Sequence, residues 1–356
     1  MQYYVMKTGM EMFDACRAYG LGLVLDTLRE DDEKEVIVSN VGIYYSVEGP
    51  EIDKSAVNRL MHLLDPNLAW KETFLTIQRS RRGDLKKATK NKIDKIGDTL
   101  RDDVDQILRK YEKPVPVEFS SSKGETLYQS MELAATKGYR VPIRSKVAYT
   151  EGSSIKVPAE DWALAALGEA HFTVWKGGVA LATIIPQPEK VMVMHCRDIR
   201  NSIDQTNVNR VSTLTTLAHM AVLLMSEIRN RKRSGDPFID KFSSLIYGAM
   251  RRTGGQLKPA SGGIFPLDFL YNLMESDPEI SGEIFEMWDH VFRIRNAKGR
   301  SLEDLSLSLS EFIAHPMMET QENYLKVHLR YLIKDDVKIR AYTEECIKEV
   351  MKNVRS

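Results

Sequence analysis

Basic side chains gathered in three separate segments are the residues of this sequence most able to do chemistry. The segment 229–263 carries eight basic residues against two acidic ones, and it also holds two glycine pairs. Lysine and arginine side chains bind phosphate oxygens, and glycine lets a backbone approach a ligand closely. The segment therefore predicts contacts with a phosphate-bearing partner. Its candidate residues are Arg231, Arg233, Arg251, Arg252 and Lys258.

The segment 78–95 has a similar excess of basic residues, close to Gly83. Two interpretations are open for it. It is either a solvated helix whose charges pair four residues apart, or an arm that contacts phosphates. The arginines next to Gly83 are typical of an exposed turn, which favours the arm. The candidate residues are Arg79, Arg81, Arg82, Lys86 and Lys87.

The segment 137–146 interleaves basic residues with Tyr139, whose ring can stack on a base. The alternative is an irregular surface loop. Its candidates are Lys137, Arg140, Arg144 and Lys146. Amide side chains that can read bases also lie near basic residues, at Gln205, Asn207, Asn209 and Gln256. If the three basic segments meet in space, they predict a groove for nucleic acid, with affinity supplied by phosphate contacts.

The sequence contains none of the common catalytic motifs that would predict an enzyme. The sequence has no GxxxxGK[ST], no GxGxxG after a strand, no HExxH and no GxSxG. His195, Cys196 and Asp198 fall together at the end of a predicted strand, where neighbouring side chains point to opposite faces and cannot share a site. The seven histidines form no cluster along the chain. We therefore expect no catalytic residue, no metal and no cofactor.

The composition predicts that any nucleic acid is bound by local basic patches and not by an overall positive charge. Fifty basic residues balance fifty acidic ones, so the formal net charge is zero. Nucleic acid would then be held by local patches while other surfaces are acidic. Three cysteines lie far apart, which favours a reducing, cytoplasmic location. The apolar run Leu214–Met225 is too short and too polar to span a bilayer, so no membrane partner is expected.

The N-terminal elements read as an α+β arrangement. A helix is expected from Thr8 to about Arg29, and Gly20 within it suggests close packing against another backbone. A hairpin follows over residues 35–47, then a basic helical insertion at about 52–112, and later a helix that begins after Pro158. Three short runs between His171 and His195, the last two joined at Pro186–Pro188, predict an antiparallel meander. Hairpin and meander would share one five-stranded sheet.

The second half of the chain reads as helical. Helical spacing recurs from Val211 to Met351 and includes Phe238–Met250. We therefore predict an α+β domain over residues 1–200 and an all-helical domain over residues 201–356. The basic segment 229–263 would then be the hinge between them. A short helix is also expected at Leu127–Ala135.

Four stretches in this order resemble one family. They are KTGMEMFDACRAYGLGLVLDTL, which leads into the hairpin VIVSNVGIYYSVEG; the basic helical insertion; the sheet segment ending VMVMHCRD; and the segment GGQLKPASGGIFPLDFL. Together they resemble the large subunit of the archaeal type I-A CRISPR interference complex, the Cascade surveillance complex. The likeness covers most of the chain in order and size.

The resemblance implies a non-catalytic subunit of an antiviral ribonucleoprotein. Such a subunit contacts the guide RNA, helps recognise a short motif beside the target in double-stranded DNA, and stabilises the opened strands. Its implied protein partners are the backbone subunit, the subunit at the RNA 5′ end, the small subunits and a recruited helicase–nuclease. The residues leave two alternatives open: a nuclease, or a protein-interaction scaffold whose basic segments are solvated surfaces.

Overall fold

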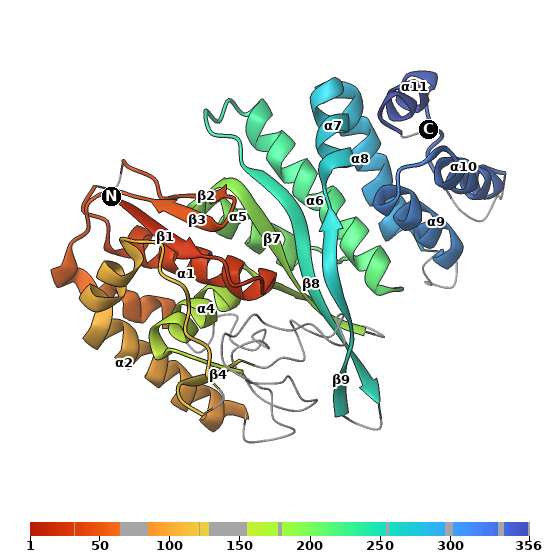
Figure 1. Ribbon diagram of the computed structural model, residues 1–356. Coiled ribbons are helices and arrows are strands. Elements are labelled where there is room, and N and C mark those ends of the chain that lie inside the picture. Colours follow the sequence, from red (N-terminus) through yellow and green to blue (C-terminus); the bar gives the residue numbers. More distant parts are fainter. Residues whose placement is uncertain are drawn as a thin grey trace.

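A single antiparallel sheet organises the protein. The computed structural model describes residues 1–31, 33–64, 85–120, 122–127, 155–176, 180–253, 256–295, 302–333 and 338–354. Within these residues the main sheet has seven strands in the order β1-β3-β2-β7-β8-β9, with β6 paired to β7 (Figure 1). The strands are β1 (Gln2–Met6), β2 (Ile37–Val41), β3 (Tyr44–Glu48), β6 (Val174–Lys176), β7 (Ala180–Met192), β8 (Lys241–Thr253) and β9 (Gln256–Pro266). The α+β fold class is thus confirmed.

Strand β1 follows the two-residue period of a half-buried sheet, and β3 departs from it only at the buried Ser46. Tyr45 and Val47 in β3 are fully buried, whereas Tyr44 is partly exposed and Glu48 is exposed. Alternating side chains point to opposite faces of a strand, so one face packs in the core and the other is open in part. The predicted hairpin is confirmed, with Gly42 at positive φ in its turn. Strand β1 was not predicted.

Two helices that are buried on almost every side pack against each other beside this sheet. They are α1 (Glu11–Leu28) and α4 (Ala159–Phe172). A Cβ atom at Gly20 would overlap the carbonyl of Leu164, and one at Gly168 would overlap the carbonyl of Cys16. The close backbone approach predicted at Gly20 is confirmed, and α4 begins after Pro158 as predicted.

The helical insertion is confirmed where the structure describes it. It contains η1 (Lys54–Leu64), a 3₁₀ segment, and the long helix α2 (Leu85–Tyr111), which packs on η1 and α4. A small ladder follows, made by β4 (Glu125–Leu127) and β5 (Ile155–Val157). The helix predicted from Leu127 is wrong at its first residue, which belongs to β4, and the rest of that prediction lies outside the described residues.

The predicted meander differs from the observed strands at the two prolines. Residues 180–192 form one continuous strand, β7, whose register shifts around Pro188 instead of turning there. A bulge absorbs prolines that cannot donate to the ladder. His171 lies in α4, and His195 lies in helix α5 (Val193–Gln205), so neither belongs to a strand.

The prediction of a helix at Phe238–Met250 is wrong, and with it the all-helical second half and the hinge. Strand β8 covers this segment and pairs with β7 on one side and β9 on the other. Leu245 and Ile246 are adjacent and both buried. A strand buried on both faces shows no alternation, so its apolar run resembles a helix segment. The sheet therefore crosses the boundary expected at residue 200.

Apart from β8 and β9, the regular elements described after residue 200 are helices, as predicted. Helix α6 (Thr213–Arg233) begins with a capping box between Ser212 and Thr215. After β9 the chain forms helices that gather at the upper right of Figure 1. They are α7 (Asp268–Ser276), α8 (Pro278–Arg293), α9 (Glu303–Ala314), α10 (Met318–Leu332) and α11 (Glu344–Asn353).

Candidate nucleic-acid interface

The tip of the β8–β9 hairpin brings basic residues together across two strands. Arg251 and Lys258 are partners in the strand register, and Ala180 of β7 pairs with Arg251 on its other side. Register partners occupy the same face of a sheet, and like charges placed directly opposite each other destabilise the pairing. A bound anion would relieve that repulsion. Arg252, the next residue of β8, pairs with Leu257.

The basic segment 229–263 does not form one patch. From Lys241 to Arg251 there are ten residue steps of strand, which span roughly 33 Å at about 3.3 Å per residue. The end of α6 and the start of β8 lie at the top of Figure 1, whereas the hairpin tip lies at the bottom. Arg231 and Arg233, at the end of α6, are therefore far from Arg251, Arg252 and Lys258.

The cations near the end of α6 are held mainly by the protein itself. Arg231 forms an ion pair with Asp198 of α5 at 3.2 Å and a longer one with Asp236 at 3.9 Å. Arg229 is buried and donates from Nε to the carbonyl of Pro278 at 2.7 Å. Arg233 is exposed at the last residue of the helix. Of the two candidate residues at the end of α6, Arg231 pairs with carboxylates of the protein and Arg233 is exposed to solvent.

His195 lies between two carboxylates at this same end. Its Nδ1 is 2.9 Å from Asp240 Oδ2, and its Nε2 is 3.4 Å from Asp236 Oδ2. The hydrogen bond with Asp240 raises the pKa of His195, against the opposing effect of burial. Asp240 also accepts the backbone N–H of Met192 at 2.8 Å. Two carboxylates stabilise a charged imidazole, so the arrangement is an ion cluster that joins β7, α5 and β8.

Cys196 does not turn this cluster into a nucleophilic site. The thiol is buried, and burial raises its pKa well above the ordinary value. A reactive cysteine needs the opposite shift, because the thiolate is the nucleophile. Sequence reasoning placed these residues on a strand and missed Asp236 and Asp240, since partners some forty residues apart leave no spacing signal.

The basic residues of α2 are partly neutralised. Lys92 binds Glu125 of β4 at 3.1 Å, and Lys95 binds the same carboxylate. Burial raises the pKa of Glu125, but the hydrogen bonds from Lys95 and Lys92 outweigh it and leave the pKa below its usual value. Lys86 and Lys87 lie earlier, in the first described turn of α2. They precede the part of the helix whose charges Glu125 neutralises.

Two candidate groups lie outside the described residues. They are Arg79, Arg81 and Arg82, together with Lys137, Arg140, Arg144 and Lys146. The second group lies in the sequence between Leu127 and Ile155, and these two residues are register partners. In Figure 1, β4 and the hairpin tip both lie in the lower part of the view. The convergence of the three basic segments stays a prediction.

The amide candidate Asn209 is part of the core. It is fully buried, and its Nδ2 donates to the carbonyl of Phe292 at 2.8 Å. Its backbone N–H donates to Nδ1 of His219 at 2.9 Å. An amide so engaged cannot read a base, so this sequence interpretation is wrong. Gln205 and Asn207 are exposed.

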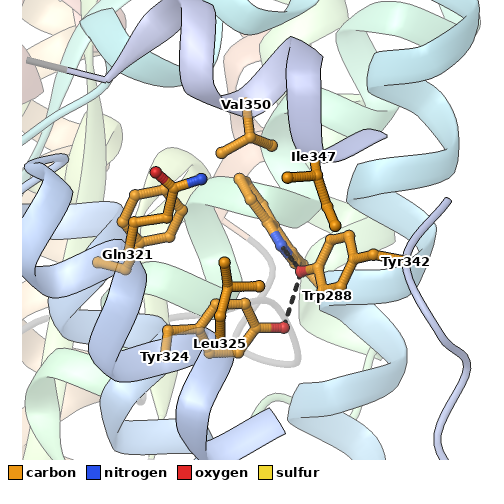
Figure 2. Close-up of a pocket in the computed structure, with 8 residues that line it drawn as sticks. Trp288, Gln321, Tyr324, Leu325, Tyr342, Ile347 and Val350 are labelled. Atoms are coloured by element: carbon orange, nitrogen blue, oxygen red, sulfur yellow. Dashed lines mark hydrogen bonds between the residues drawn. The ribbon is translucent and has the colours of Figure 1, made fainter. Parts of the chain in front are cut away.

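The aromatic hollow among the C-terminal helices is core packing and too small for a ligand. Figure 2 shows its lining side chains, which come from α8, α9, α10, α11 and the segment before α11. Tyr342 accepts a hydrogen bond from Nε1 of Trp288 at 2.6 Å, and its hydroxyl lies 2.8 Å from that of Tyr324. The cavity has a volume of about 10 Å³, which suits at most one water molecule.

The described residues contain neither a metal cluster nor a membrane-spanning helix. In the described part of the chain, no group of three or more His, Cys, Asp or Glu side chains is placed to hold a metal ion. None of the described helices is both long and apolar enough to cross a membrane.

Comparison with known proteins gives one extensive match. No protein-family model matches the chain. The chain is 37% identical over 356 residues to an uncharacterized protein of Archaeoglobus fulgidus, and the match covers 98% of this chain and 97% of that protein. Similarity along nearly the whole of both chains indicates the same fold and the same order of elements in each.

Proposed function

The chain belongs to the same family as this uncharacterized protein of Archaeoglobus fulgidus, and we propose that it is a non-catalytic subunit that binds nucleic acid within a multiprotein complex. The observation that carries the proposal is the pairing of Arg251 with Lys258 at the hairpin tip. Two cations placed opposite each other, in a chain with no net charge, are best explained by a partner that supplies negative charge.

The complex that fits this role is an RNA-guided CRISPR interference complex of the type I-A Cascade class. In it the chain is the large subunit, which binds target DNA, helps recognise the short duplex motif beside the target and stabilises strand opening. Its partners are the guide RNA, the backbone, RNA 5′-end-binding and small subunits, and a recruited helicase–nuclease. The proposed complex works in the cytoplasm. The sequence resemblance supports this finer assignment.

The hairpin supports such a role through position and charge. A two-stranded ribbon can reach into or along a DNA groove, while its basic residues contact phosphates on either side. Phosphate contacts position a duplex without reading its sequence. Sequence reading is then left to base pairing with the guide RNA. The subunit needs no catalytic group for this task.

Binding without cleavage is the first test. Purified protein is incubated with labelled double-stranded DNA and Mg²⁺ at low salt, and both retardation and strand cleavage are measured. Retardation with intact DNA is expected. Cleavage that disappears when a carboxylate is replaced would make the protein a nuclease. No retardation even at low salt would favour a scaffold without nucleic acid.

The assembled complex gives a second test with a matched control. Replacing Arg251 and Arg252 together by alanine should weaken DNA binding by the complex while the chain still folds. The control replaces Lys326 and Lys348, two exposed lysines on α10 and α11 that pair with Glu322 and Glu344. It removes the same charge from a different surface and should leave binding unchanged. Equal effects of the two variants would contradict the proposal.

A further inference from the structure

A row of five side chains crosses the partly exposed face of the sheet. The register pairs Tyr4 of β1 with Ser46 of β3, and Ser46 with Ser39 of β2. It continues from Ser39 to Lys190 of β7 and from Lys190 to Lys241 of β8. Register partners share a face, so all five lie on one side. Four inter-strand steps of about 4.8 Å make the row roughly 19 Å long.

One end of the row carries two tyrosine rings. Tyr44 of β3 lies next to Tyr4, with ring centroids 5.2 Å apart and planes at 85°. Both side chains are partly exposed. Their neighbours Tyr3 and Tyr45 are buried on the opposite face, in contact with the core. Since the core needs only the second pair, the first pair is available to a partner.

The other end of the row carries two lysines placed opposite each other. Lys190 and Lys241 are both exposed and are partners in the register. As at the hairpin tip, two like charges on neighbouring strands cost stability that a bound anion restores. The tip is a separate place, because ten residue steps of β8 separate Lys241 from Arg251.

A surface hollow continues the face beyond Tyr4. The residues Gln2, Ile37 and Glu48 form the next row of the sheet and line this hollow together with Lys34, Glu35 and Pro50. Its volume is about 460 Å³. That volume falls within the range of small-molecule sites, so the hollow can receive one base.

We propose that this face binds a short segment of single-stranded RNA, an inference that rests on the proposed function in its choice of a nucleic-acid partner. Tyr4 and Tyr44 stack on bases, and Lys190 and Lys241 hold the phosphates. Sheet faces with exposed aromatic rings on neighbouring strands bind two or three unstacked bases in this way. A duplex is excluded because its bases are already stacked and its edges cannot reach the two rings.

The polar groups between the two ends favour RNA over single-stranded DNA. Ser39 is partly exposed in the middle of the row, whereas its neighbour Ser46 is buried and accepts a hydrogen bond from Nε2 of Gln2 at 2.9 Å. The Ser39 hydroxyl can pair with a ribose 2′-hydroxyl, which both donates and accepts and which DNA lacks. Glu48 lies one row away and disfavours a closer phosphate there.

The test compares labelled riboadenylate and deoxyadenylate oligonucleotides of equal length by fluorescence anisotropy. Replacing Tyr4 and Tyr44 by alanine should weaken riboadenylate binding by about 5- to 150-fold for each ring. Replacing both by phenylalanine keeps the rings and should leave affinity near that of the unaltered protein. Phenylalanine variants that bind as poorly as the alanine variants would overturn the stacking role, and equal binding of both oligonucleotides would overturn the choice of RNA.

Three further variants distinguish a failure of this proposal from a failure of folding and from a failure of the proposed function. Lys190→Gln with Lys241→Gln changes exposed side chains only, and it should lower the steepness of the salt dependence by about 1.4 for two single-strand phosphates. Lys326→Gln with Lys348→Gln is the matched control and should change nothing. Arg251→Ala with Arg252→Ala should lose duplex binding yet keep riboadenylate binding. Duplex binding that the Arg251 and Arg252 variant retains would thus count against the proposed function, and an unchanged salt dependence in the Lys190 and Lys241 variant would count against the sheet face.

Discussion

The two ends of the β8–β9 hairpin treat basic residues in opposite ways. At the end near α6, Arg231 and His195 are surrounded by Asp198, Asp236 and Asp240. At the tip, Arg251 faces Lys258 across the strands. At the first end the charges are paired within the protein, and at the second the strand register pairs two basic residues. The same stretch of sequence therefore contains both structural cations and candidate ligand-binding cations.

The difference teaches that a run of basic residues is not a surface. Arg231 and Arg251 look equivalent along the chain, but α5 supplies a carboxylate to the first. An exposed ion pair of this kind contributes only about 0–1 kcal/mol, so pairing at the α6 end serves to arrange the elements more than to stabilise them. At the tip the register places two basic residues opposite each other, an arrangement that a bound anion would stabilise.

The largest effect is expected where a cation is most completely enclosed. Arg17 is fully buried in α1 and binds Asp14 at 2.9 Å and Asp161 at 3.0 Å. Replacing it by methionine leaves Asp14 buried without this cation, while Asp161 keeps Lys110 at 2.6 Å. The free energy of unfolding should fall by about 3–5 kcal/mol. Urea unfolding measures this value. Arg251→Met is the control, with an expected change within about 0.5 kcal/mol. Similar losses in both variants would break the distinction between structural and ligand-binding cations.

The next effect depends on pH at the α6 end of the hairpin. The pKa of His195 is raised in the folded protein, so the ion cluster stabilises the fold fully below the unfolded pKa of about 6.5 and loses this contribution as pH rises through the folded value. Urea unfolding of the protein and of His195→Gln, at about pH 6 and about pH 9, measures the contribution of the charged imidazole to stability. The difference in the free energy of unfolding between the two proteins should be larger at the lower pH. A larger difference at the higher pH would contradict the charged imidazole.

The smallest effect on stability is expected at the tip, and it has the opposite sign. Lys258→Glu places a carboxylate opposite Arg251 and should raise the free energy of unfolding by about 0.2–1 kcal/mol. The same change should lower the steepness of the salt dependence of DNA binding by about 1. A variant that is more stable but binds less well would sharpen the contrast between the ends. Lower stability together with unchanged binding would show that Lys258 has a structural partner.

Much of the frame could be predicted from local pattern alone. Gly20 inside an apolar helix indicated a backbone contact, and Leu164 of α4 provides it. The hairpin at β2–β3 and the C-terminal helices follow from alternation and from helical spacing. Strand β8 could not be found in this way, because Leu245 and Ile246 are buried on opposite faces and erase the strand period.

The site was less predictable than the frame, for a physical reason. Charge roles depend on partners distant in sequence, as with Arg231 and Asp198 or His195 and Asp240. The pairing of Arg251 with Lys258 needed only the hairpin, but the helix expected at Phe238–Met250 hid it. The row from Tyr4 to Lys241 joins five strands, so no local spacing could have indicated it.

The salt dependence of DNA binding tests the central claim most directly. The logarithm of the binding constant of the protein for duplex DNA, plotted against the logarithm of salt concentration, should have a slope of roughly −4 to −5 for ~4–6 phosphate contacts. Arg251→Ala with Arg252→Ala should make this slope shallower by about 2 and leave urea unfolding unchanged. The same slope in the variant and the unaltered protein would show that the hairpin tip does not contact phosphate.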